Sequence, residues 1–213
     1  MAVRTLLACA ATAALGAGAL AAATDGFSAF TYDTARVQRA LRAPYPLPVD
    51  LALVTHEGRH MRLADFDAPV LLVNFVFTRC AGICRSAGDV YGRLGHALAA
   101  DIERGGLRLL TVSIDPTRDP PQELARWRAR YAPSGAQGWI VGAPPDRSEL
   151  ARWQDAFGIV VLPLPNGDFE HNAAIAVVGP QRRIRAFVTP ERADELPQWV
   201  RRAAQAVDDA RGA

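Results

Sequence analysis

The positions of apolar residues along the chain predict a buried β-sheet. Two continuous apolar runs, at 69–77 and 107–115, are rich in branched side chains and shorter than typical helices, so they indicate strands covered on both faces. Around Glu57 and Gly58, apolar and polar residues alternate instead, which predicts a β-hairpin. The pattern therefore begins with a hairpin and continues with central strands.

Helical spacing of apolar residues fills the intervals between the strands. A helix is predicted after each apolar run, a third ends at Gly158, and a fourth closes the chain, at 86–100, 120–131, 146–157 and 196–207. Shorter strands are predicted at 138–143 and on both sides of Gly179-Pro180. We therefore expect an α/β fold, a thioredoxin-like sandwich whose central mixed β-sheet is flanked by helices, with an N-terminal β-hairpin.

The first residues have the pattern of an export segment. Arg4 precedes an apolar stretch that ends in small residues suited to cleavage, although a stretch of this length also suits a membrane anchor. We expect 1–23 to be a signal peptide or membrane anchor, 24–48 an extended linker with three prolines, and 49–208 the folded domain. The folded domain is then periplasmic or otherwise extracytoplasmic.

Composition excludes two classes of function. The 213 residues carry a net charge of +2, and the 24 basic residues are arginines scattered along the chain. A nucleic-acid-binding surface needs clustered basic residues, so we expect no nucleic-acid partner. Without any lysine, the chain also lacks the Gly-Lys-Ser/Thr loop that binds nucleotide phosphates.

Cys80 and Cys84 lie where the first central strand passes into a helix. Functional sites in such sheets form at strand ends, and helix amides there lower thiol pKa values, so at least one accessible thiolate is expected near neutral pH. Two thiolates favour Cu(I) or Zn(II). The alternative is a structural disulfide, which for so short a loop adds only about 2 kcal/mol.

A metal site needs a third ligand, and His171 is the candidate. It stands just before the strand expected beside the cysteine-bearing strand, and its imidazole suits copper. Thiol-disulfide reductases of this fold have a proline before that strand, whereas this chain has none there. His56 and His60 are expected to be solvated loop residues, and His96 a surface or packing residue on the helix.

Three segments together resemble the SCO/SenC family, copper-handling proteins of thioredoxin fold involved in cytochrome c oxidase assembly. The resemblance covers residues 49–187 and rests on "VLLVNFVFTRCAGIC", "TVSIDPTRDPPQELARWRARY" and "FEHNAAIAVVGPQRRIRAF". It implies that Cys80, Cys84 and His171 bind one copper ion, as Cu(I) or Cu(II). It also implies that Asp115 lies near the site and supports it or caps its loop, although Asp-Pro after a strand is an ordinary turn as well.

The chain departs from the family pattern in the cysteine loop. The family usually has prolines where Ala81 and Arg85 stand here, while Glu170 retains the acid that precedes the histidine. These departures predict a more flexible loop and a changed copper affinity or client. Arg118 and Asp119 are expected to hold the start of the helix that follows them.

Two functions, together with a weaker third, remain open at this point. The first is a metallochaperone that delivers copper to the dinuclear copper site of the copper-bearing oxidase subunit or to another cuproprotein. It would exchange copper with other chaperones, and the redox state of the cysteines would control whether copper binds. The second is a thiol-disulfide reductase in which Cys80 and Cys84 are catalytic and keep the client's copper-ligand cysteines reduced. A thiol peroxidase fits less well, because Thr78 lies two residues before the cysteine and not three.

Overall fold

The computed structural model describes residues 2–24, 26–80, 82–132, 138–165 and 167–211, which fall into two units divided between Ala43 and Pro44. The first unit contains helices α1 (Ala2–Ala23) and α2 (Tyr32–Arg42). By length and composition α1 is apolar enough to cross a membrane.

The segment predicted as an extended linker is partly helical. Thr31 starts α2 by a reciprocal cap, in which its Oγ1 accepts from the main-chain N–H of Thr34 at 3.1 Å and its own N–H donates to Oγ1 of Thr34 at 3.0 Å. The prolines lie further on, where strand β1 (Tyr45–Pro46) pairs with the edge of the main sheet. The proline cluster therefore indicated an extended stretch of only a few residues.

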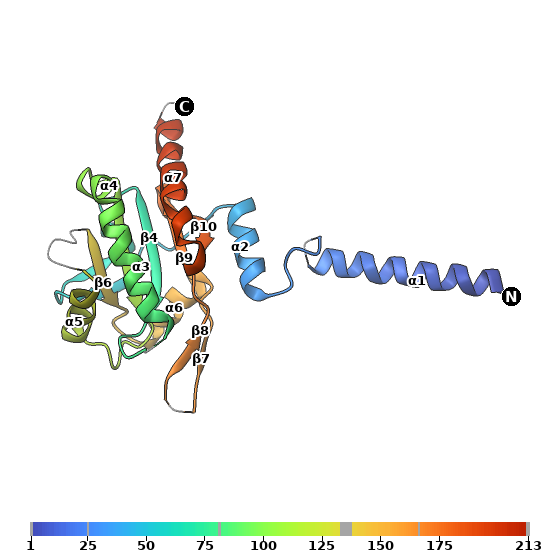
Figure 1. The fold of residues 1–213 in the computed structure, drawn as a ribbon, viewed down its shortest axis with the longest axis horizontal. Helices are drawn as coiled ribbons and strands as arrows, with labels where there is room; N and C mark the ends of the chain where they lie inside the picture. Colours follow the sequence, from blue (N-terminus) through green and yellow to red (C-terminus); the bar gives the residue numbers. More distant parts are fainter. Residues whose placement is uncertain (1, 25, 81, 133–137, 166, 212–213) are drawn as a thin grey trace. The chain divides into compact units, whose positions relative to one another are not determined.

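The second unit is built on an eight-stranded mixed sheet (Figure 1). Its order is β1-β10-β9-β4-β5-β6-β2-β3, with β4, β5 and β6 parallel and the remaining pairs antiparallel. Both predicted apolar runs form central strands, and every residue of β4 is buried. The strands other than β1 are β2 (Ala52–Thr55), β3 (His60–Arg62), β4 (Val70–Val76), β5 (Leu107–Ser113), β6 (Trp139–Ala143), β9 (Ile175–Gly179) and β10 (Arg183–Val188).

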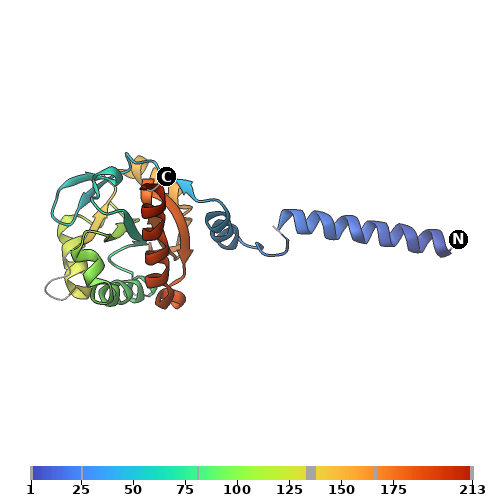
Figure 2. The same ribbon diagram turned by 90° about the horizontal axis from the view of Figure 1, so that it is seen from above.

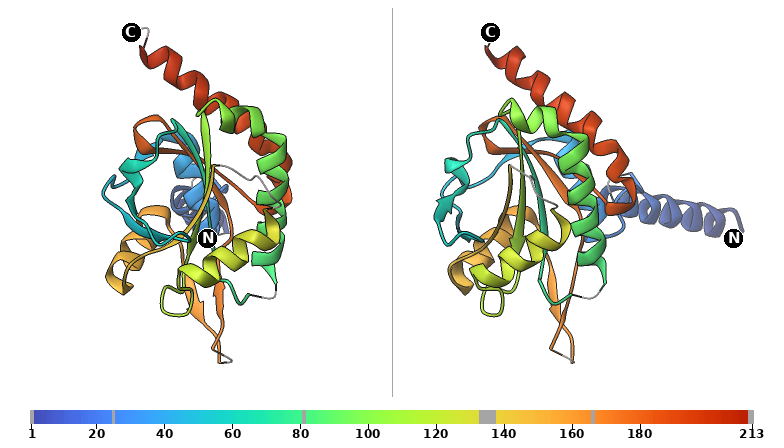
Figure 3. Two further views of the ribbon diagram at one scale, coloured as in Figure 1. Left: turned by 90° about the vertical axis from the view of Figure 1, so that its left-hand side faces the viewer. Right: turned by 60° about the vertical axis from the view of Figure 1, so that its left-hand side comes forward.

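Helices cover both faces of this sheet (Figure 3). On one face, Tyr91 of α3 and Trp127 of α5 pack on Trp139 of β6, and α7 lies along β9 and β10 (Figure 2). On the other face, Phe157 of α6 packs against Phe75 of β4. The predicted sandwich is thus confirmed. Its helical segments are α3 (Ile83–Ala97), α4 (Ala99–Glu103), α5 (Pro121–Tyr131), α6 (Arg147–Phe157), α7 (Leu196–Arg211) and the 3-10 turns η1 (Leu63–Asp65), η2 (Pro180–Arg182) and η3 (Pro190–Glu195).

Helix α3 is held close to α5 by two glycines on one side of the helix. A Cβ atom at Gly92 would lie 2.4 Å from the main-chain oxygen of Tyr131, and one at Gly88 would lie 2.6 Å from the ring of the same tyrosine. Neither position has room for a side chain. This close approach fixes α3, whose first turn carries the second cysteine of the loop.

A second, two-stranded sheet was not predicted. It is a hairpin of β7 (Val161–Pro163) and β8 (Phe169–His171), in which Val161 pairs with His171. Each strand has three residues, too few for alternation to be recognised, and Pro163 and Pro165 interrupt the sequence pattern. The hairpin projects from the end of the main sheet (Figures 1 and 3).

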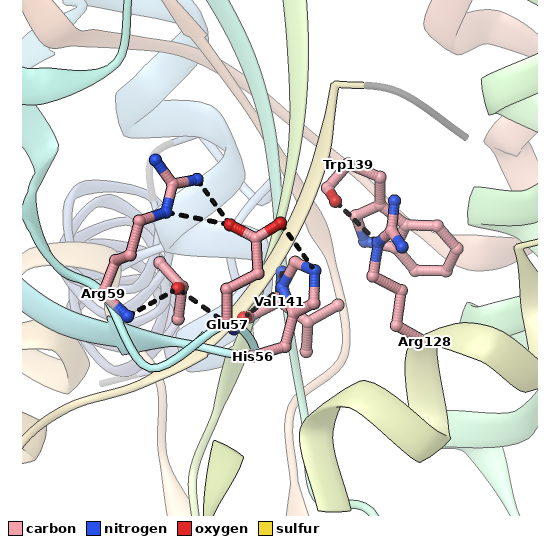
Figure 4. Close-up of polar contacts among 7 residues, drawn as sticks. His56, Glu57, Arg59, Arg128, Trp139 and Val141 are labelled. Carbon is pink, nitrogen blue, oxygen red and sulfur yellow. Dashed lines mark hydrogen bonds and ion pairs between the residues drawn. The ribbon is translucent and has the colours of Figure 1, made fainter. Parts of the chain in front are cut away.

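His56 differs from its predicted solvated position, although His60 and His96 are exposed as expected. Only 11% of the His56 side chain is exposed. Its Nδ1 lies 3.2 Å from the carbonyl oxygen of Val141, and its Nε2 lies 4.0 Å from Glu57, which is itself paired with an arginine (Figure 4). The hairpin turn folds back against β6, which removes this imidazole from water.

The burial of His56 predicts a loss of stability in acid. Burial is the main cause that lowers the pKa of His56, and repulsion from Arg128 lowers it further. The hydrogen bond to Val141 and the charge of Glu57 raise this pKa by smaller amounts. The contribution of His56 to folding is therefore complete above the unfolded pKa of about 6.5 and is lost as the pH falls through that value towards the lower folded one. We expect His56→Asn, which cannot take up this proton, to show a shallower decrease in the free energy of unfolding between pH 7 and pH 5.

Urea unfolding at several pH values measures this dependence. His60→Asn is the matched control, because it also removes one histidine from the same hairpin but from an exposed position. Equal slopes for wild type and His56→Asn would contradict the linkage.

Candidate metal centre

The two cysteines lie in the loop that joins β4 to α3. The main-chain N–H of Cys80 donates to the carbonyl of Phe77 at 3.2 Å, so the chain turns directly after the strand. Cys80 is half-buried at this turn, whereas Cys84, the second residue of α3, is 1% exposed. The loop therefore carries one partly exposed cysteine and one cysteine inside the domain.

His171 ends β8, and its imidazole faces the buried cysteine. Its Nε2 lies 3.8 Å from Sγ of Cys84, and its Nδ1 lies 3.3 Å from the carbonyl oxygen of Asn172. Because a carbonyl oxygen only accepts hydrogen bonds, Nδ1 carries the proton in the neutral ring, and the lone pair of Nε2 faces the sulfur. Burial lowers the pKa of His171, which favours the neutral form that binds metals.

The sheet order explains why residues 87 positions apart meet here. Strand β9, which follows His171, pairs with β4 through Val73 and Ala176, as predicted. The ring centroid of the buried Phe77 lies 6.4 Å from that of His171, so the imidazole packs against a core side chain. The position of His171 thus follows from the pairing of the strand after it with the strand before the cysteines.

The expected lowering of a thiol pKa is wrong for Cys84. Burial raises its pKa well above the ordinary value, and the neighbouring Cys80 thiol raises it further. The helix amides near the N-terminus of α3 do not outweigh the loss of hydration. Cys84 is therefore a thiol in the metal-free protein, and a proton must leave when a metal binds.

Cys80 lies beside Cys84, but no complete set of metal ligands is formed among the described residues. Its thiol is close enough to affect the pKa of Cys84, and neither cysteine forms a disulfide. Within the described ranges, no three His, Cys, Asp or Glu side chains are arranged to hold a metal ion. The structure thus brings Cys84 and His171 together, with Cys80 half-buried beside Cys84.

Asp119 holds the cysteine loop, a role that the sequence did not predict for it. One carboxylate oxygen accepts from the N–H of Thr78 at 3.0 Å and from the hydroxyl of Ser113 at 2.6 Å, and the other accepts from the Thr78 hydroxyl at 2.6 Å. The side chain therefore ties the ends of β4 and β5 together instead of holding the start of α5. It is almost fully buried, and burial raises its pKa.

Asp115 lies beside the loop and binds arginines. Its carboxylate accepts a hydrogen bond from Arg118 and lies 3.9 Å from Arg79, the residue before Cys80. Within the described part of the chain, no hydrogen bond joins it to the cysteines or to His171. Its predicted role in supporting the metal site stays a prediction.

The comparison with known families decides the classification. A sequence profile described as SCO1/SenC matches residues 40–205, which include the cysteine loop and His171. This chain belongs to the SCO1/SenC family. The resemblance inferred from three sequence segments is confirmed, and it extends further towards both ends than residues 49–187.

Relatives of the SCO1/SenC chain share its fold at low identity. The SCO1 protein homolog of Bacillus subtilis is 25% identical over 130 residues, 60% of this chain and 66% of the relative. A SCO1/SenC family lipoprotein from Bacillus anthracis superposes with a TM-score of 0.68 at 17% identity, over 77% of this chain and 99% of that one. ScoI of Bradyrhizobium japonicum with copper bound has a TM-score of 0.58 at 19% identity, over 74% and 98%.

At these identities the solved structures show the fold alone, and they confirm the thioredoxin-like sandwich. The match to this chain covers only part of each curated relative. The chain spans between 31% and 66% of their lengths.

Proposed function

We propose that this chain binds one copper ion through Cys80, Cys84 and His171 and passes it to a cuproprotein during the assembly of cytochrome c oxidase. The observation that carries the proposal is the 3.8 Å approach of Nε2 of His171 to Sγ of Cys84, with the second cysteine on the same loop. Two sulfurs and one imidazole nitrogen form a soft ligand set that binds copper well. The copper-bound relative and the SCO1/SenC family membership support the assignment.

The three proposed ligands have different roles in copper binding, which follow from how deeply each is buried. Cys84 and His171 form the preformed part of the site, because the sulfur of buried Cys84 and the imidazole nitrogen of partly buried His171 already face each other. Cys80 is the accessible ligand, and its loop closes over the ion. An accepting protein would reach this sulfur first, so ligand exchange begins at Cys80.

The redox state of the cysteines would control loading. Oxidation to a disulfide removes both sulfur ligands, as two protons and two electrons pass to an external oxidant. Reduction restores the two free thiols seen in the structure. Copper uptake would therefore require a reductant in the compartment of the domain.

We place the domain outside the cytoplasm, as a periplasmic or membrane-anchored protein. Helix α1 is long and apolar enough to serve as a membrane anchor or as an export signal. A structurally similar SCO1/SenC protein from Bacillus anthracis is a lipoprotein. The copper-bearing subunit of the oxidase, another cuproprotein or other copper chaperones would be its partners there.

A thiol-disulfide reductase is the second candidate, and the unequal burial of the cysteines favours it. An accessible Cys80 beside a buried Cys84 suits a nucleophile and a resolving thiol. In that case Cys84→Ser would accumulate a mixed disulfide between Cys80 and the client. Metal transfer without such a species would exclude this function.

Copper titration of the purified protein tests the proposal. The reduced protein should take up one equivalent of Cu(I), and the oxidised protein none. Loaded with Cu(II), it should show a thiolate-to-copper charge-transfer band that weakens in Cys80→Ser, which keeps one sulfur ligand, and that is absent in Cys80→Ser/Cys84→Ser. Equal uptake by the reduced and oxidised forms would contradict the proposal.

A further inference from the structure

The β7–β8 hairpin, which ends at His171, packs on the domain through one face of β8. Side chains alternate along a strand, so Phe169 and His171 lie on one face and the exposed Glu170 lies on the other. The ring centroid of Phe77, the residue that follows β4, lies 5.6 Å from that of Phe169 and 6.4 Å from that of His171. The face that bears the proposed ligand therefore packs on the strand end that leads into the cysteine loop.

Arg118 contacts this hairpin at two points. Its Nη1 donates to the carbonyl oxygen of Gly167, in the turn, at 2.9 Å. Its guanidinium lies over the ring of Phe169, 5.1 Å from the ring centre, where the π-electrons attract a cation. In the described part of the chain, the side-chain hydrogen bonds of Arg118 thus join Asp115 to the hairpin, and none of them goes to α5, whose start it was expected to hold.

Asp115 provides a fixed support for this guanidinium. It lies just after β5, is 6% exposed, and accepts a hydrogen bond from Nε of Arg118. Its own N–H donates to Oγ of Ser113 at 3.0 Å, and Ser113 pairs with Val76 in the central sheet. Because a guanidinium is a planar group with its donors in a fixed fork, the bond at Nε sets the direction of Nη1. Arg118 therefore reaches the hairpin from the end of a central strand.

The base of the hairpin is held separately from its turn. At the base, Oδ1 of Asn172 accepts from the N–H of Val160 at 2.8 Å. In the turn, Gly167 has a φ of 80°, a left-handed conformation that favours glycine, and its N–H donates to the carbonyl of Leu164 at 3.0 Å. The hairpin is thus a formed element fixed at its base, and Arg118 ties its turn to the domain.

We propose that Arg118 is a positioning residue, which holds the face of β8 that packs on the domain and so keeps His171 directed at Cys84. The inference rests on the proposed function, in which His171 and Cys84 are copper ligands. Arg118 acts through the hairpin, by restricting movement of the turn about the base, so that the two ligands stay at the 3.8 Å seen in the structure. Without this restraint the imidazole has more conformational freedom to lose when the ion binds, which weakens binding.

Cu(I) binding by the reduced Arg118→Gln variant tests this role. We expect the affinity to fall about tenfold, because loss of a residue that orients a metal ligand costs 10–100-fold. Arg126→Gln is the matched control, because Arg126 also pairs with an acid three residues before it but is 72% exposed on α5. The control should bind copper as wild type does, and an equal affinity of Arg118→Gln would overturn the proposal.

Electron paramagnetic resonance of the Cu(II)-loaded protein shows whether the imidazole is displaced. Wild type should show coupling to one imidazole nitrogen. This coupling should weaken in Arg118→Gln and recover in part in Arg118→Lys, which keeps the charge but not the fork of donors. If Arg118→Gln loses affinity while its nitrogen coupling stays that of wild type, Arg118 acts through its charge alone, and the positioning role is wrong.

Phe169→Leu removes the ring beneath the guanidinium and keeps an apolar side chain in its place. We expect it to weaken copper binding in the same direction as Arg118→Gln. In the double variant the two losses should not add, because both substitutions remove one shared contact. Fully additive losses would show that the two residues act independently, which contradicts the proposal.

Amide hydrogen exchange of the reduced, metal-free protein separates this role from the copper function. Amides of residues 161–171 should exchange faster in Arg118→Gln, whereas those of β4 and β5 should not change. If exchange increases throughout the domain, Arg118 serves the fold in general, and the proposal is overturned. If wild type binds copper and Arg118→Gln matches it in exchange and affinity, the positioning role is wrong and the copper function stands. If wild type binds no copper, the proposed function is wrong, and the exchange rates alone decide whether Arg118 holds the hairpin.

Discussion

Replacing His171 by alanine is expected to weaken Cu(I) binding by the reduced protein at least about a hundredfold. Loss of a residue that merely orients a metal ligand already costs 10–100-fold in affinity, and the imidazole here is proposed to be a ligand itself. Its Nε2 is unprotonated and lies 3.8 Å from Sγ of Cys84, so the substitution leaves the buried sulfur without its nitrogen partner. Competition with a chromophoric Cu(I) chelator measures the affinity.

Two controls separate ligation from a general disturbance of the fold. His96→Ala removes an exposed histidine from α3 and should leave copper affinity unchanged. Free imidazole should restore part of the affinity of His171→Ala, because the lost ring leaves space beside Cys84. An affinity of His171→Ala equal to that of wild type would remove His171 from the site.

Asp119→Ala is expected to destabilise the domain by about 3 kcal/mol or more. The substitution leaves the buried hydroxyl of Ser113 and the part-buried N–H and hydroxyl of Thr78 without their acceptor. A fully buried unpaired group costs about 1–3 kcal/mol, and the two Thr78 groups add to this cost. The energy of ionising the buried carboxylate offsets part of this loss. Urea unfolding of the reduced, metal-free protein measures the change.

Asp119→Asn distinguishes the hydrogen bonds from the charge. Its amide oxygen still accepts, so the loss should be smaller than in the alanine variant, and copper affinity should follow the same order because Thr78 leads into the cysteine loop. Asp89→Ala, at an exposed position in α3, serves as the control. The proposed role of Asp119 is wrong if Asp119→Ala is as stable as Asp89→Ala.

The central part of the fold was predictable because its signals are local. Continuous apolar runs identified β4 and β5, and Gly158 marked the end of α6, where it takes the left-handed conformation with φ of 62°. The hairpin around Gly58 followed from alternation. The short β7–β8 hairpin lacked any comparable signal, since its strands are brief and contain proline.

The approach of His171 to Cys84 was predictable from the sequence, but the protonation chemistry of Cys84 was not. The strand order brought His171 to the cysteine loop, and this order follows from the sequence pattern. Burial of Cys84 depends on tertiary packing, which reversed the expected change in its pKa. The contact of Asp119 with Thr78 spans 41 residues, and only the parallel pairing of β4 with β5 could have indicated it.

The central claim is a single copper site made by two cysteines and one histidine. X-ray absorption at the copper edge of the Cu(I)-loaded, reduced protein tests this claim most directly. The account predicts two sulfur scatterers and one nitrogen scatterer in wild type. It also predicts that the nitrogen contribution is lost in His171→Ala and that one sulfur is lost in Cys80→Ser. A shell of sulfur alone, unchanged in His171→Ala, would contradict it.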